Sequence, residues 1–491
     1  MADVARTVVV VGAGCAGTLT AVDLLRRPGG PLRVVLVERS GAFGRGVAYS
    51  TADDRHTLNV AAERMSAFPD EPGHFAAWAV ERLGPLEPGA YLPRRLYGDY
   101  LCDLLARAER DAPPGRCLER VRGDVVDVVA GEGDGRASGA VAGSGAVAGG
   151  VGAAAGGVAR RAAAASGAAA TVVLADGRRI GADAVVLALG ALPPAAPVGL
   201  PDDPRVVGSP WLPGALDGAG PGATTLLVGS GLTAVDVALT CCGGGGRSRV
   251  VAISRSGCLP YEQLPGLRAP VVPSVPPPSA PATVAALERW LGIHVARARR
   301  RGADWRDAID GVRPRVQTLW RSLPEREQRR FLRERSRAWE LRRHRMAPEV
   351  GARVRGLVRE GRLLVRAGRA LGVRALPEAV ELLVDDCGEM RTLRADRIVV
   401  CAGAGTSVAT AGVPLLDALL RRGLAVPDAH GLGLRADGDG ALVGRDGGAR
   451  PWLRLLGPLR RGELWETTAV GEIRVQAQRV GAGTHKYINP D

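Results

Sequence analysis

Lysine, clustered histidine and paired cysteine are what this chain lacks. Lys486 is the only lysine, and the six histidines are dispersed along the sequence, so we predict no metal site. The eight cysteines include no Cys-x-x-Cys pair. Cys241 and Cys242 are adjacent and therefore poorly placed for a useful disulfide, so we expect free thiols. The sequence also shows no catalytic triad and no obvious nucleophile.

Long apolar segments are absent as well. No run of 18 apolar residues lacks a charge or a glycine-rich turn, which argues against a membrane-spanning helix. The apolar N-terminal segment carries Asp23 and a regular glycine pattern, so a signal peptide is not expected. We therefore predict a cytoplasmic protein without a membrane partner, and the length of 491 residues suggests two or three domains.

The formal net charge of +14 comes largely from one region. Residues 294–345 contain 17 arginines and 7 acidic residues, which are interspersed along expected helices. A solvated helical face is one interpretation, and attraction of an anionic cofactor or substrate is another. A nucleic-acid partner is not expected, because no known binding motif accompanies the charge.

The first pattern with chemical content lies between residues 7 and 38. Four consecutive valines, Val8–Val11, are typical of a strand buried in a parallel sheet. A Gly-x-Gly-x-x-Gly turn follows and opens a helix over residues 18–27, whose N-terminal amides and dipole favour phosphate. The next expected strand, residues 33–38, ends in Glu38, whose carboxylate can accept hydrogen bonds from an unphosphorylated ribose. A glycine-rich turn without a ligand is the alternative.

A second copy of the pattern begins at Thr224. An expected strand over residues 224–228 leads into Gly-Ser-Gly-Leu-Thr-Ala and a helix over residues 234–242. The following strand, residues 249–253, ends in Ser-Arg-Ser rather than in an acid. The guanidinium of Arg255 can bind a 2′-phosphate, which a carboxylate would repel. We therefore predict FAD at the first site and NADPH at the second, with a plain surface role for Arg255 as the alternative.

The segments between these patterns carry weaker signals. The glycine-punctuated loop at residues 39–51 could close over a cofactor or could be a plain connection. Residues 130–170 are nearly all Gly, Ala, Ser, Val and Arg, which predicts a flexible insertion. Asp176-Gly177 predicts a hairpin between strands at residues 171–175 and 184–190.

The C-terminal half is expected to alternate helices and strands. A proline-rich stretch at residues 270–281 introduces helices up to about residue 345, and residues 354–365 and 381–385 are expected to be strands. A helix with a threonine cap is expected over residues 466–477. Its N-terminus could support the electron-rich edge of a reduced flavin, or the helix could simply cover the sheet.

A set of short motifs lies in and around the two glycine turns. They are Gly44–Ser50, Leu58–Val60, Pro93-Arg94, Tyr97-Gly98, Gly229–Asp236, Ser254-Arg255, Asp304-Trp305, His344–Pro348, Gly457–Gly462 and Trp465–Val470. With this set the chain resembles bacterial FAD/NAD(P)-binding flavoproteins of the two-dinucleotide-binding-domain superfamily, in the family that includes the aspartate N-monooxygenases forming nitrosuccinate. The resemblance covers nearly the whole chain apart from residues 130–170. It implies an α/β fold with two Rossmann-like domains, a glutathione-reductase-like FAD domain and an NADPH domain, plus a helical insertion.

The resemblance implies a discontinuous FAD domain. Its parts are expected at residues 1–129, 171–215 and 392–491, with the flexible insertion at residues 130–170. The NADPH domain is expected at residues 216–280 and 346–391, around a helical region at residues 281–345. The predicted cofactor-binding residues are Gly12, Gly14, Gly17, Glu38, Arg39, Gly46, Asn59, Gly190, Gly229, Gly231, Thr233, Arg255, Gly457, Thr467, Thr468 and Val470.

Two departures from related enzymes bear on the substrate. The ornithine and lysine N-hydroxylating monooxygenases carry a D-x3-L-A-T-G-Y motif, whereas residues 183–191 here have Leu189 in place of Thr and Ala191 in place of Tyr. The Baeyer–Villiger signature F-x-G-x3-H-x3-W is absent. These departures leave the implied fold intact and weaken the link to those particular substrates.

The main functional hypothesis is an NADPH-dependent flavin monooxygenase of specialised metabolism. NADPH would reduce FAD, O2 would add to the flavin C4a atom, and the amine nitrogen of a small polar or anionic substrate such as aspartate would attack the distal oxygen. His344 is interpreted as structural or phosphate-facing rather than as a general base. A substrate carboxylate would need arginine, and the candidates are Arg45, Arg94, Arg95, Arg342 and Arg345.

Two alternatives stay open. An NADPH-dependent flavin reductase could pass electrons to a quinone or a partner protein, whereas a disulfide acceptor is disfavoured by the missing Cys-x-x-Cys. A redox-sensing or scaffold flavoprotein would bind FAD with little turnover, but such a protein has no need of the selective NADPH site that Arg255 indicates. The oligomeric state is left open, with a homodimer as one option.

Overall fold

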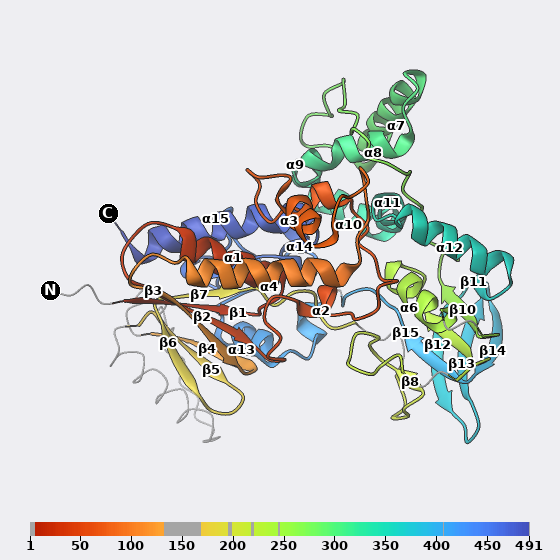
Figure 1. Ribbon diagram of the computed structural model, residues 1–491, viewed down its shortest axis with the longest axis horizontal. Helices are drawn as coiled ribbons and strands as arrows, with labels where there is room; N and C mark the ends of the chain where they lie inside the picture. Colours follow the sequence, from red (N-terminus) through yellow and green to blue (C-terminus); the bar gives the residue numbers. More distant parts are fainter. Residues whose placement is uncertain are drawn as a thin grey trace.

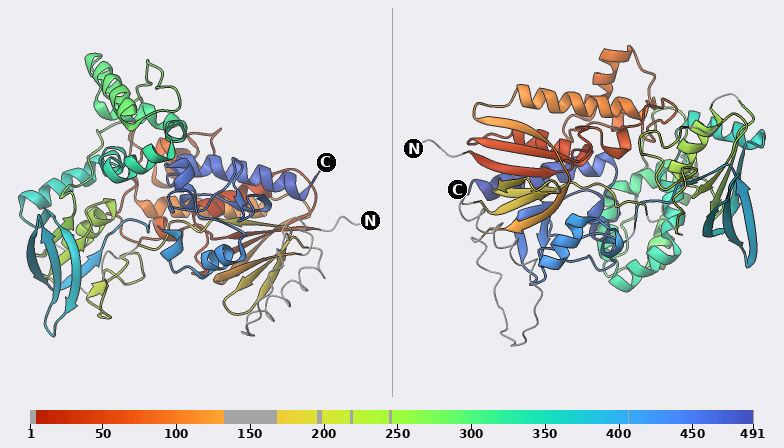
Figure 2. Two further views of the ribbon diagram at one scale, coloured as in Figure 1. Left: turned by 180° about the vertical axis from the view of Figure 1, so that it is seen from behind. Right: turned by 90° about the horizontal axis from the view of Figure 1, so that it is seen from below.

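Two sheet-containing domains lie at opposite ends of the molecule, and a helical region projects beside them (Figure 1, Figure 2). The computed structural model describes residues 5–131, 168–194, 199–217, 220–243, 246–405 and 407–490. Most of the expected insertion at residues 130–170 lies outside the described residues, so its flexibility stays a prediction.

The first domain is built on a six-stranded sheet with the order β16-β17-β7-β1-β2-β3. Neighbouring strands are parallel except for β16, which pairs antiparallel with β17. The strands are β1 (Arg6–Val11), β2 (Leu32–Glu38), β3 (Arg116–Arg122), β7 (Ala184–Leu187), β16 (Ala441–Val443) and β17 (Ala449–Leu455).

Alternating side chains of β1 enter two different cores. Val8 and Val10 pack on the side of α1 (Cys15–Arg26), α4 (Arg94–Arg110) and α15 (Val470–Ile488). Val9 and Val11 pack on the other side, against β4 (Val125–Ala130), β5 (Ala170–Leu174), β6 (Arg179–Ala182) and α13 (Pro414–Arg422). Figure 1 shows these two layers on opposite sides of the sheet. Because both faces are covered, the strand needs an unbroken apolar run rather than an alternating one.

The second domain repeats this plan around a five-stranded parallel sheet with the order β11-β10-β9-β15-β8. One face packs against α6 (Leu232–Cys242) and α12 (Pro348–Arg359). The other face packs against a three-stranded antiparallel sheet, β12-β13-β14. The strands are β8 (Val206–Val207), β9 (Thr224–Val228), β10 (Arg249–Ser254), β11 (Leu363–Ala367), β12 (Arg369–Ala375), β13 (Val380–Asp386), β14 (Glu389–Ala395) and β15 (Arg397–Val400).

The helical region has a core of its own that also includes a residue from the C-terminal segment. Trp290, Trp320 and Val316 pack with Trp465, whose ring stacks on that of Trp320 at 5.3 Å between centroids. The helices are α7 (Val284–Arg300), α8 (Trp305–Val312), η2 (Arg313–Arg315), α9 (Val316–Ser322), α10 (Glu325–Glu334) and α11 (Ser336–Arg343). This shared core attaches the helical region to the first domain.

Short elements complete the first domain. They are α2 (Gly46–Tyr49), η1 (Ala62–Arg64), α3 (His74–Leu83), η3 (Val408–Thr410), η4 (Pro458–Arg460) and α14 (Arg461–Leu464). Within the described ranges, no helix has both the length and the apolar character needed to cross a membrane.

Two sequence-based expectations about secondary structure are corrected by the structure. The Asp176-Gly177 turn does make a hairpin, but β5 pairs with β6, while residues 184–187 form β7 beside β1. Residues 354–359 belong to α12 rather than to a strand. Both errors arise because short apolar runs of Val, Leu and Ala satisfy helix, hairpin and parallel-strand patterns alike.

Two further differences concern the C-terminal part. Residues 392–400 contribute β14 and β15 to the second domain, so its last strand lies beyond the boundary expected after residue 391. Helix α15 begins at Val470 rather than at Glu466, and its N-cap position is Ala469, which has no side chain able to cap. The threonines expected to cap the helix therefore lie in the preceding turn, where the hydroxyl of Thr467 donates to the carbonyl of Gly457.

Candidate functional site

The first glycine turn is held by very close backbone packing. Gly12 has a φ of +97°, and a Cβ there would lie 2.4 Å from the carbonyl oxygen of Ala188, at the end of β7. A Cβ on Gly17 would lie 1.8 Å from the carbonyl oxygen of Gly12. Neither position admits a side chain, so strand, turn and helix α1 can approach only with glycine there. The free N-terminal amides of α1 are thereby directed to the end of the sheet, where a phosphate can meet them.

The Glu38 carboxylate is fixed beside this turn. Its Oε2 accepts a hydrogen bond from the amide of Ala13 (2.9 Å), and its Oε1 accepts from the amide and hydroxyl of Ser40 (3.1 and 2.9 Å). No basic side chain pairs with Glu38 among the residues that the structure describes. An ionised carboxylate has about four lone-pair positions, so it can still accept from the hydroxyls of a ribose.

The loop after Glu38 folds back onto the turn. The amide of Gly44 donates to the carbonyl of Ala13 (2.9 Å). Gly46 has a φ of +57°, and a Cβ there would lie 2.8 Å from the Cα of Gly14. The loop therefore packs on the turn, and its closing over a cofactor stays a prediction. Arg39 is exposed and Asn59 is half-buried, and their cofactor roles stay predictions.

A buried polar network ties the turn after β17 to helix α15. The amide of Gly457 donates to Oε1 of Gln476 (3.0 Å), the hydroxyl of Thr467 donates to the carbonyl of Gly457 (3.0 Å), and Gln476 Nε2 donates to Thr467 Oγ1 (2.6 Å). A Cβ on Gly457 would lie 3.8 Å from the Cβ of Ala16 in α1. The network therefore places the N-termini of α1 and α15 near one another. Gln476 was not identified from the sequence, because a single glutamine inside an amphipathic helix carries no motif.

Other predicted residues surround the same end of the sheet. Gly190, with a φ of +73°, follows β7, and a Cβ there would meet no atom within 4 Å. Thr468 is exposed, and Val470 is the buried first residue of α15. The structure thus brings the predicted glycines of the first domain, together with Thr467, Thr468 and Val470, to one edge of the first sheet, and their contacts with a cofactor stay a proposal.

The second glycine turn also packs against the carbonyl that follows a neighbouring strand, but the space in front of it is more open. Gly229 has a φ of +123°, and a Cβ there would lie 2.5 Å from the carbonyl oxygen of Cys401, which follows β15. A Cβ on Gly231, by contrast, would meet no atom within 4 Å. This empty space lies at the N-terminus of α6, whose first turn contains Thr233. Arg255 follows β10, is exposed, and has no carboxylate partner within the described part of the chain. A phosphorylated ribose fits this arrangement.

Most of the predicted substrate arginines are occupied by carboxylates of the chain itself. Arg345 is 1% exposed and its guanidinium lies 2.5 Å from Asp310, so it is a buried structural cation and not an accessible ligand. The other pairs are Arg45 with Asp99 (2.5 Å), Arg94 with Asp236 (2.8 Å) and Arg95 with Asp54. Arg342 alone of the five has no acidic partner among the described residues. It is exposed, donates to the carbonyl of Ala338 (2.9 Å), and lies 5.8 Å from the ring of Tyr261.

Arg94 instead joins the two domains. Arg94 forms an ion pair with Asp236 of α6. Nearby, the ring of His56 lies 2.9 Å from the hydroxyl of Thr240, and that hydroxyl donates to Asp53 (2.6 Å). Burial raises the pKa of Asp236, and the guanidinium of Arg94 opposes this shift. Burial also acts to raise the pKa of Asp53, but hydrogen bonds from Arg55 and Thr240 outweigh it, so the pKa lies below its usual value. These contacts fix how the two sheets face each other.

The helical region meets the first domain at a buried ion pair. Arg343 Nε lies 3.1 Å from Glu466 Oε2, and both residues are 7–8% exposed. The indole of Trp339 donates to the other carboxylate oxygen (3.0 Å). Burial and the neighbouring guanidinium groups, Arg343 first, lower the pKa of His344 to about 3, so this imidazole is neutral near pH 7. A neutral His344 agrees with a structural role and does not supply positive charge to a phosphate.

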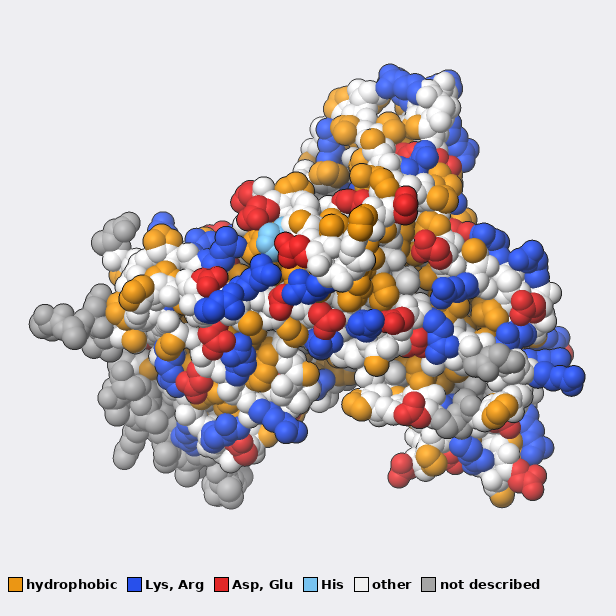
Figure 3. All heavy atoms as spheres, in the orientation of Figure 1, with side chains coloured by type: hydrophobic (Ala, Val, Ile, Leu, Met, Phe, Trp, Pro, Cys, Tyr) orange, Lys and Arg blue, Asp and Glu red, His pale blue; other side chains and the backbone are white. Residues whose placement is uncertain are grey.

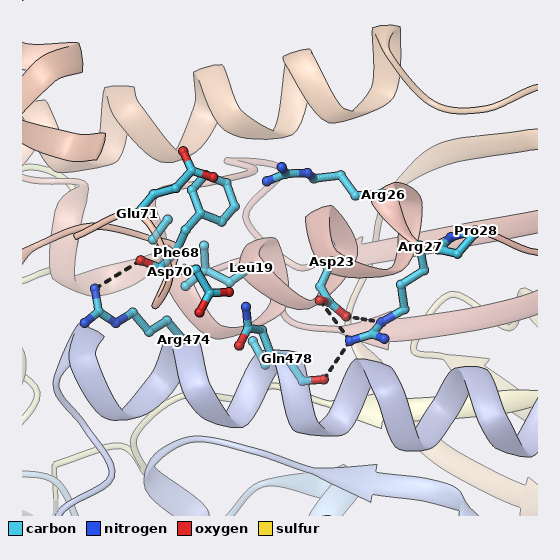
Figure 4. Close-up of a pocket in the computed structure, with 12 residues that line it drawn as sticks. Leu19, Asp23, Arg26, Arg27, Pro28, Phe68, Asp70, Glu71, Arg474 and Gln478 are labelled. Carbon is cyan, nitrogen blue, oxygen red and sulfur yellow. Dashed lines mark hydrogen bonds and ion pairs between the residues drawn. The ribbon is translucent and has the colours of Figure 1, made fainter. Parts of the chain in front are cut away.

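A separate hollow lies away from both glycine turns. Figure 4 shows it between α1, the segment around Phe68 and α15, and its volume is about 280 Å³. Asp23 and Arg27 form an ion pair on one wall, and Arg474 donates to the carbonyls of Ser66 and Phe68 on another. Basic and acidic side chains are also interspersed over the face seen in Figure 3, as expected for a solvated surface. No group of three or more His, Cys, Asp or Glu side chains in the described ranges could hold a metal ion.

Comparison with known proteins agrees with this geometry. A family model described as FAD-NAD(P)-binding matches residues 9–149. A search of curated proteins finds no match. Among solved structures, the reduced form of ornithine hydroxylase from Pseudomonas aeruginosa is 15% identical with a TM-score of 0.62, over 99% of this chain and 100% of that one.

Two further structures give similar values. The ornithine N-hydroxylase of Kutzneria sp. 744, solved with reduced FAD, NADP+ and L-ornithine, is 17% identical with a TM-score of 0.58, over 99% of this chain and 100% of that one. The L-lysine 6-monooxygenase of Pseudomonas syringae is 14% identical with a TM-score of 0.59, over 98% and 99%. The chain therefore has the α/β fold of flavoproteins with two dinucleotide-binding domains, which confirms the predicted fold class. Its N-terminal part is an FAD/NAD(P)-binding domain.

Proposed function

We propose that this protein is an FAD-dependent, NADPH-using monooxygenase that hydroxylates the amine nitrogen of a small polar or anionic substrate. The observation that carries the proposal is the pair of glycine turns, each at the end of a parallel sheet. The second strand of the first unit ends in Glu38, whereas that of the second unit ends in Ser254 and is followed by the exposed Arg255. The likeness in fold to amine N-hydroxylases over nearly the whole chain supports the proposal.

The residues present fit both cofactors. FAD would lie at the first turn, with its pyrophosphate at the N-terminus of α1, its ribose at Glu38 and its flavin near Thr467, Thr468 and Val470. NADPH would lie at the second turn, where the space in front of Gly231 is open and Arg255 is free to bind a 2′-phosphate. When bound, the flavin supplies the chemistry that accepts a hydride and activates O2.

The protein's own contribution is to position these groups and to exclude water. The contacts from Arg94 to Asp236 and from Asp53 to Thr240 hold the two dinucleotide sites in a fixed relation. The Arg343–Glu466 pair holds the helical region against the turn that contains Thr467. The substrate amine must arrive as the free base, because an ammonium has no lone pair with which to attack oxygen. For a substrate with a carboxylate, Arg342 is the arginine of the five that is free to bind it.

The test is a coupled measurement of the overall reaction, in which amine, O2, NADPH and a proton give hydroxylamine, NADP+ and water. The FAD-loaded protein would be mixed with NADPH, O2 and a panel of amines that includes aspartate, ornithine, lysine and cadaverine. We expect one class of amine to give hydroxylamine nearly one-to-one with NADPH consumed. Stoichiometric peroxide with every amine, together with fast reduction of a quinone, would instead establish a reductase.

A variant separates the role of Arg342 from general damage. R342A should raise KM for an amine that carries a carboxylate by about tenfold, because one charge-assisted hydrogen bond is lost, and should leave the KM for cadaverine unchanged. R333A removes an exposed arginine that pairs with Glu334 and is the matched control. Equal effects of R342A on both amines would show that Arg342 does not bind the substrate carboxylate.

A further inference from the structure

One arginine of the helical region reaches the second glycine turn. Arg337 lies in α11, and its Nη2 is 3.3 Å from the hydroxyl of Ser230 and 3.3 Å from the carbonyl of Cys258. Ser230 stands between Gly229 and Gly231 and is 2% exposed. Its hydroxyl also lies 2.7 Å from Ser254 Oγ and 2.7 Å from the Cys258 carbonyl. Arg337 is therefore bonded into the turn itself.

The charge of this arginine has no counterpart in the described part of the chain. Arg337 is half-buried, its two partners are neutral, and no carboxylate lies within ion-pair distance. It also lies beside the N-terminus of α6, where the helix dipole is positive. Two positive poles that face each other without an acid repel each other, and an anion between them removes the repulsion. The open space in front of Gly231 gives such an anion a place.

The position of Arg337 differs from that of Arg255 in a way that selects between phosphates. In a βαβ dinucleotide site the pyrophosphate lies over the glycine turn, and the ribose lies at the end of the second strand. Arg337 contacts the middle residue of the glycine turn and the carbonyl of Cys258 in the loop after β10, whereas Arg255 directly follows Ser254 at the end of β10 and makes no contact with the turn among the hydrogen bonds of the described residues. The hydrogen-bonded pair Ser230–Ser254 lies between the two positions.

We propose that Arg337 binds the pyrophosphate of the nicotinamide cofactor, while Arg255 is left to bind the 2′-phosphate. This inference rests on the proposed NADPH site. It assigns a cofactor contact to the helical region, which the sequence patterns did not connect with either glycine turn. The same short helix carries Trp339 and Arg343, which hold Glu466 next to Thr467. Helix α11 would therefore contact both the pyrophosphate of the cofactor and the turn that contains Thr467.

The experiment compares ligands that carry one phosphate group or the other. Binding of NADP+, NAD+ and adenosine 2′-monophosphate to the FAD-loaded protein would be measured by calorimetry, with no turnover involved. R337L should weaken NADP+ and NAD+ alike, by about 10- to 100-fold, and should leave adenosine 2′-monophosphate unchanged. R255L should weaken NADP+ and adenosine 2′-monophosphate and spare NAD+. Inorganic pyrophosphate should compete with NAD+ in the unaltered protein and not in R337L.

Two further variants control for charge and for folding. R337Q keeps hydrogen-bond donors without the charge and should lose nearly as much affinity as R337L, whereas R337K should lose less. R335A removes an arginine two positions away that pairs with Glu288, and should bind all three ligands normally. Unchanged NAD+ affinity in both R337L and R337Q would overturn the assignment, as would equal weakening of adenosine 2′-monophosphate. If the unaltered protein bound no NADP+ at all, the proposed NADPH site itself would be rejected.

Discussion

The ion pair between Arg343 and Glu466 should be the contact on which attachment of the helical region depends most strongly. Both side chains are 8% exposed, and the carboxylate accepts from the Arg343 guanidinium (3.1 Å) and from the Trp339 indole (3.0 Å). The backbone carbonyl of Glu466 accepts a further hydrogen bond from Gln317 (3.0 Å). Removing the carboxylate leaves a buried guanidinium without the acid that is bonded to it, and this is expected to cost about 3–5 kcal/mol.

The neighbouring pair between Arg461 and Glu340 provides the matched control. It also joins the helical region to the C-terminal segment, at 2.7 Å, but its side chains are 28% and 32% exposed. Solvent screening limits such a pair to about 0–1 kcal/mol. E466L should therefore destabilise the helical region several times more than E340L. The double variant R343M/E466L should recover most of the loss, because no unpaired charge remains in the buried site.

The stability of the helical region in these variants can be measured by urea unfolding followed by tryptophan fluorescence. Trp290, Trp320, Trp339 and Trp465, four of the eight tryptophans, belong to or pack against the core of the helical region, so its unfolding changes the emission. With a slope of about 1.5 kcal/mol per molar urea, the loss in E466L corresponds to a midpoint lower by roughly 2–3 M. Because a multidomain chain need not unfold in one step, the first transition is the one compared. Equal midpoints for E466L and E340L would refute the reasoning.

Three other predictions follow from contacts already described. G231A should fold and bind FAD normally but weaken NADP+ binding by tenfold or more, because its Cβ has space in the protein and none beside a pyrophosphate. G229A should fail to fold stably, since its Cβ would meet the Cys401 carbonyl. Similar thermal melts for the two variants would contradict this prediction. The ring of His344, with its pKa lowered to about 3, should not titrate between pH 5 and 8 in an NMR titration. Because the unfolded chain protonates this ring below about pH 6.5, its contribution to stability is present above that pH and is lost as the pH falls towards 3, and H344Q should remove this part of the pH dependence. The pKa of Asp53 is lowered, so its contribution to stability is present above about pH 4 and is lost as the pH falls through the pKa of Asp53 in the folded protein. In D53N, the rate of proteolysis between the domains should therefore rise less as the pH falls. An unchanged rise would count against the contact with Thr240.

Much of the fold could be predicted from sequence because local and global requirements agree there. The runs at β1, β2 and β9 are apolar on both faces, and β1 and β9 stand directly before glycine turns, a combination that specifies parallel strands buried between layers. The residues of the two turns could be named in advance for the same reason. Where strand and helix backbones pack closely, glycine is required at fixed positions, and the spacing of these glycines is visible in the sequence.

The contacts that are missed by sequence reasoning connect segments far apart in the chain. Gln476 and Arg337 carry no motif, and each gains its meaning from a partner more than eight positions away, Thr467 for one and Ser230 for the other. The candidate substrate arginines could not be ranked from the sequence for a related reason. Arg45, Arg94, Arg95 and Arg345 look as free as Arg342 in the sequence, and only the fold supplies their carboxylates.

The two domains solve one steric problem in the same way and differ in charge. In each, the first glycine of the turn lies against a carbonyl that follows the neighbouring strand, Ala188 after β7 in one and Cys401 after β15 in the other. In each, the helix after the turn directs its amides to the end of a parallel sheet. Since the backbone frames match, geometry alone does not say which dinucleotide belongs where. The assignment of FAD and NADPH therefore depends on the end of the second strand. Glu38 ends this strand in one domain and would repel the additional phosphate, whereas Ser254 ends it in the other and is followed by Arg255, which can bind that phosphate.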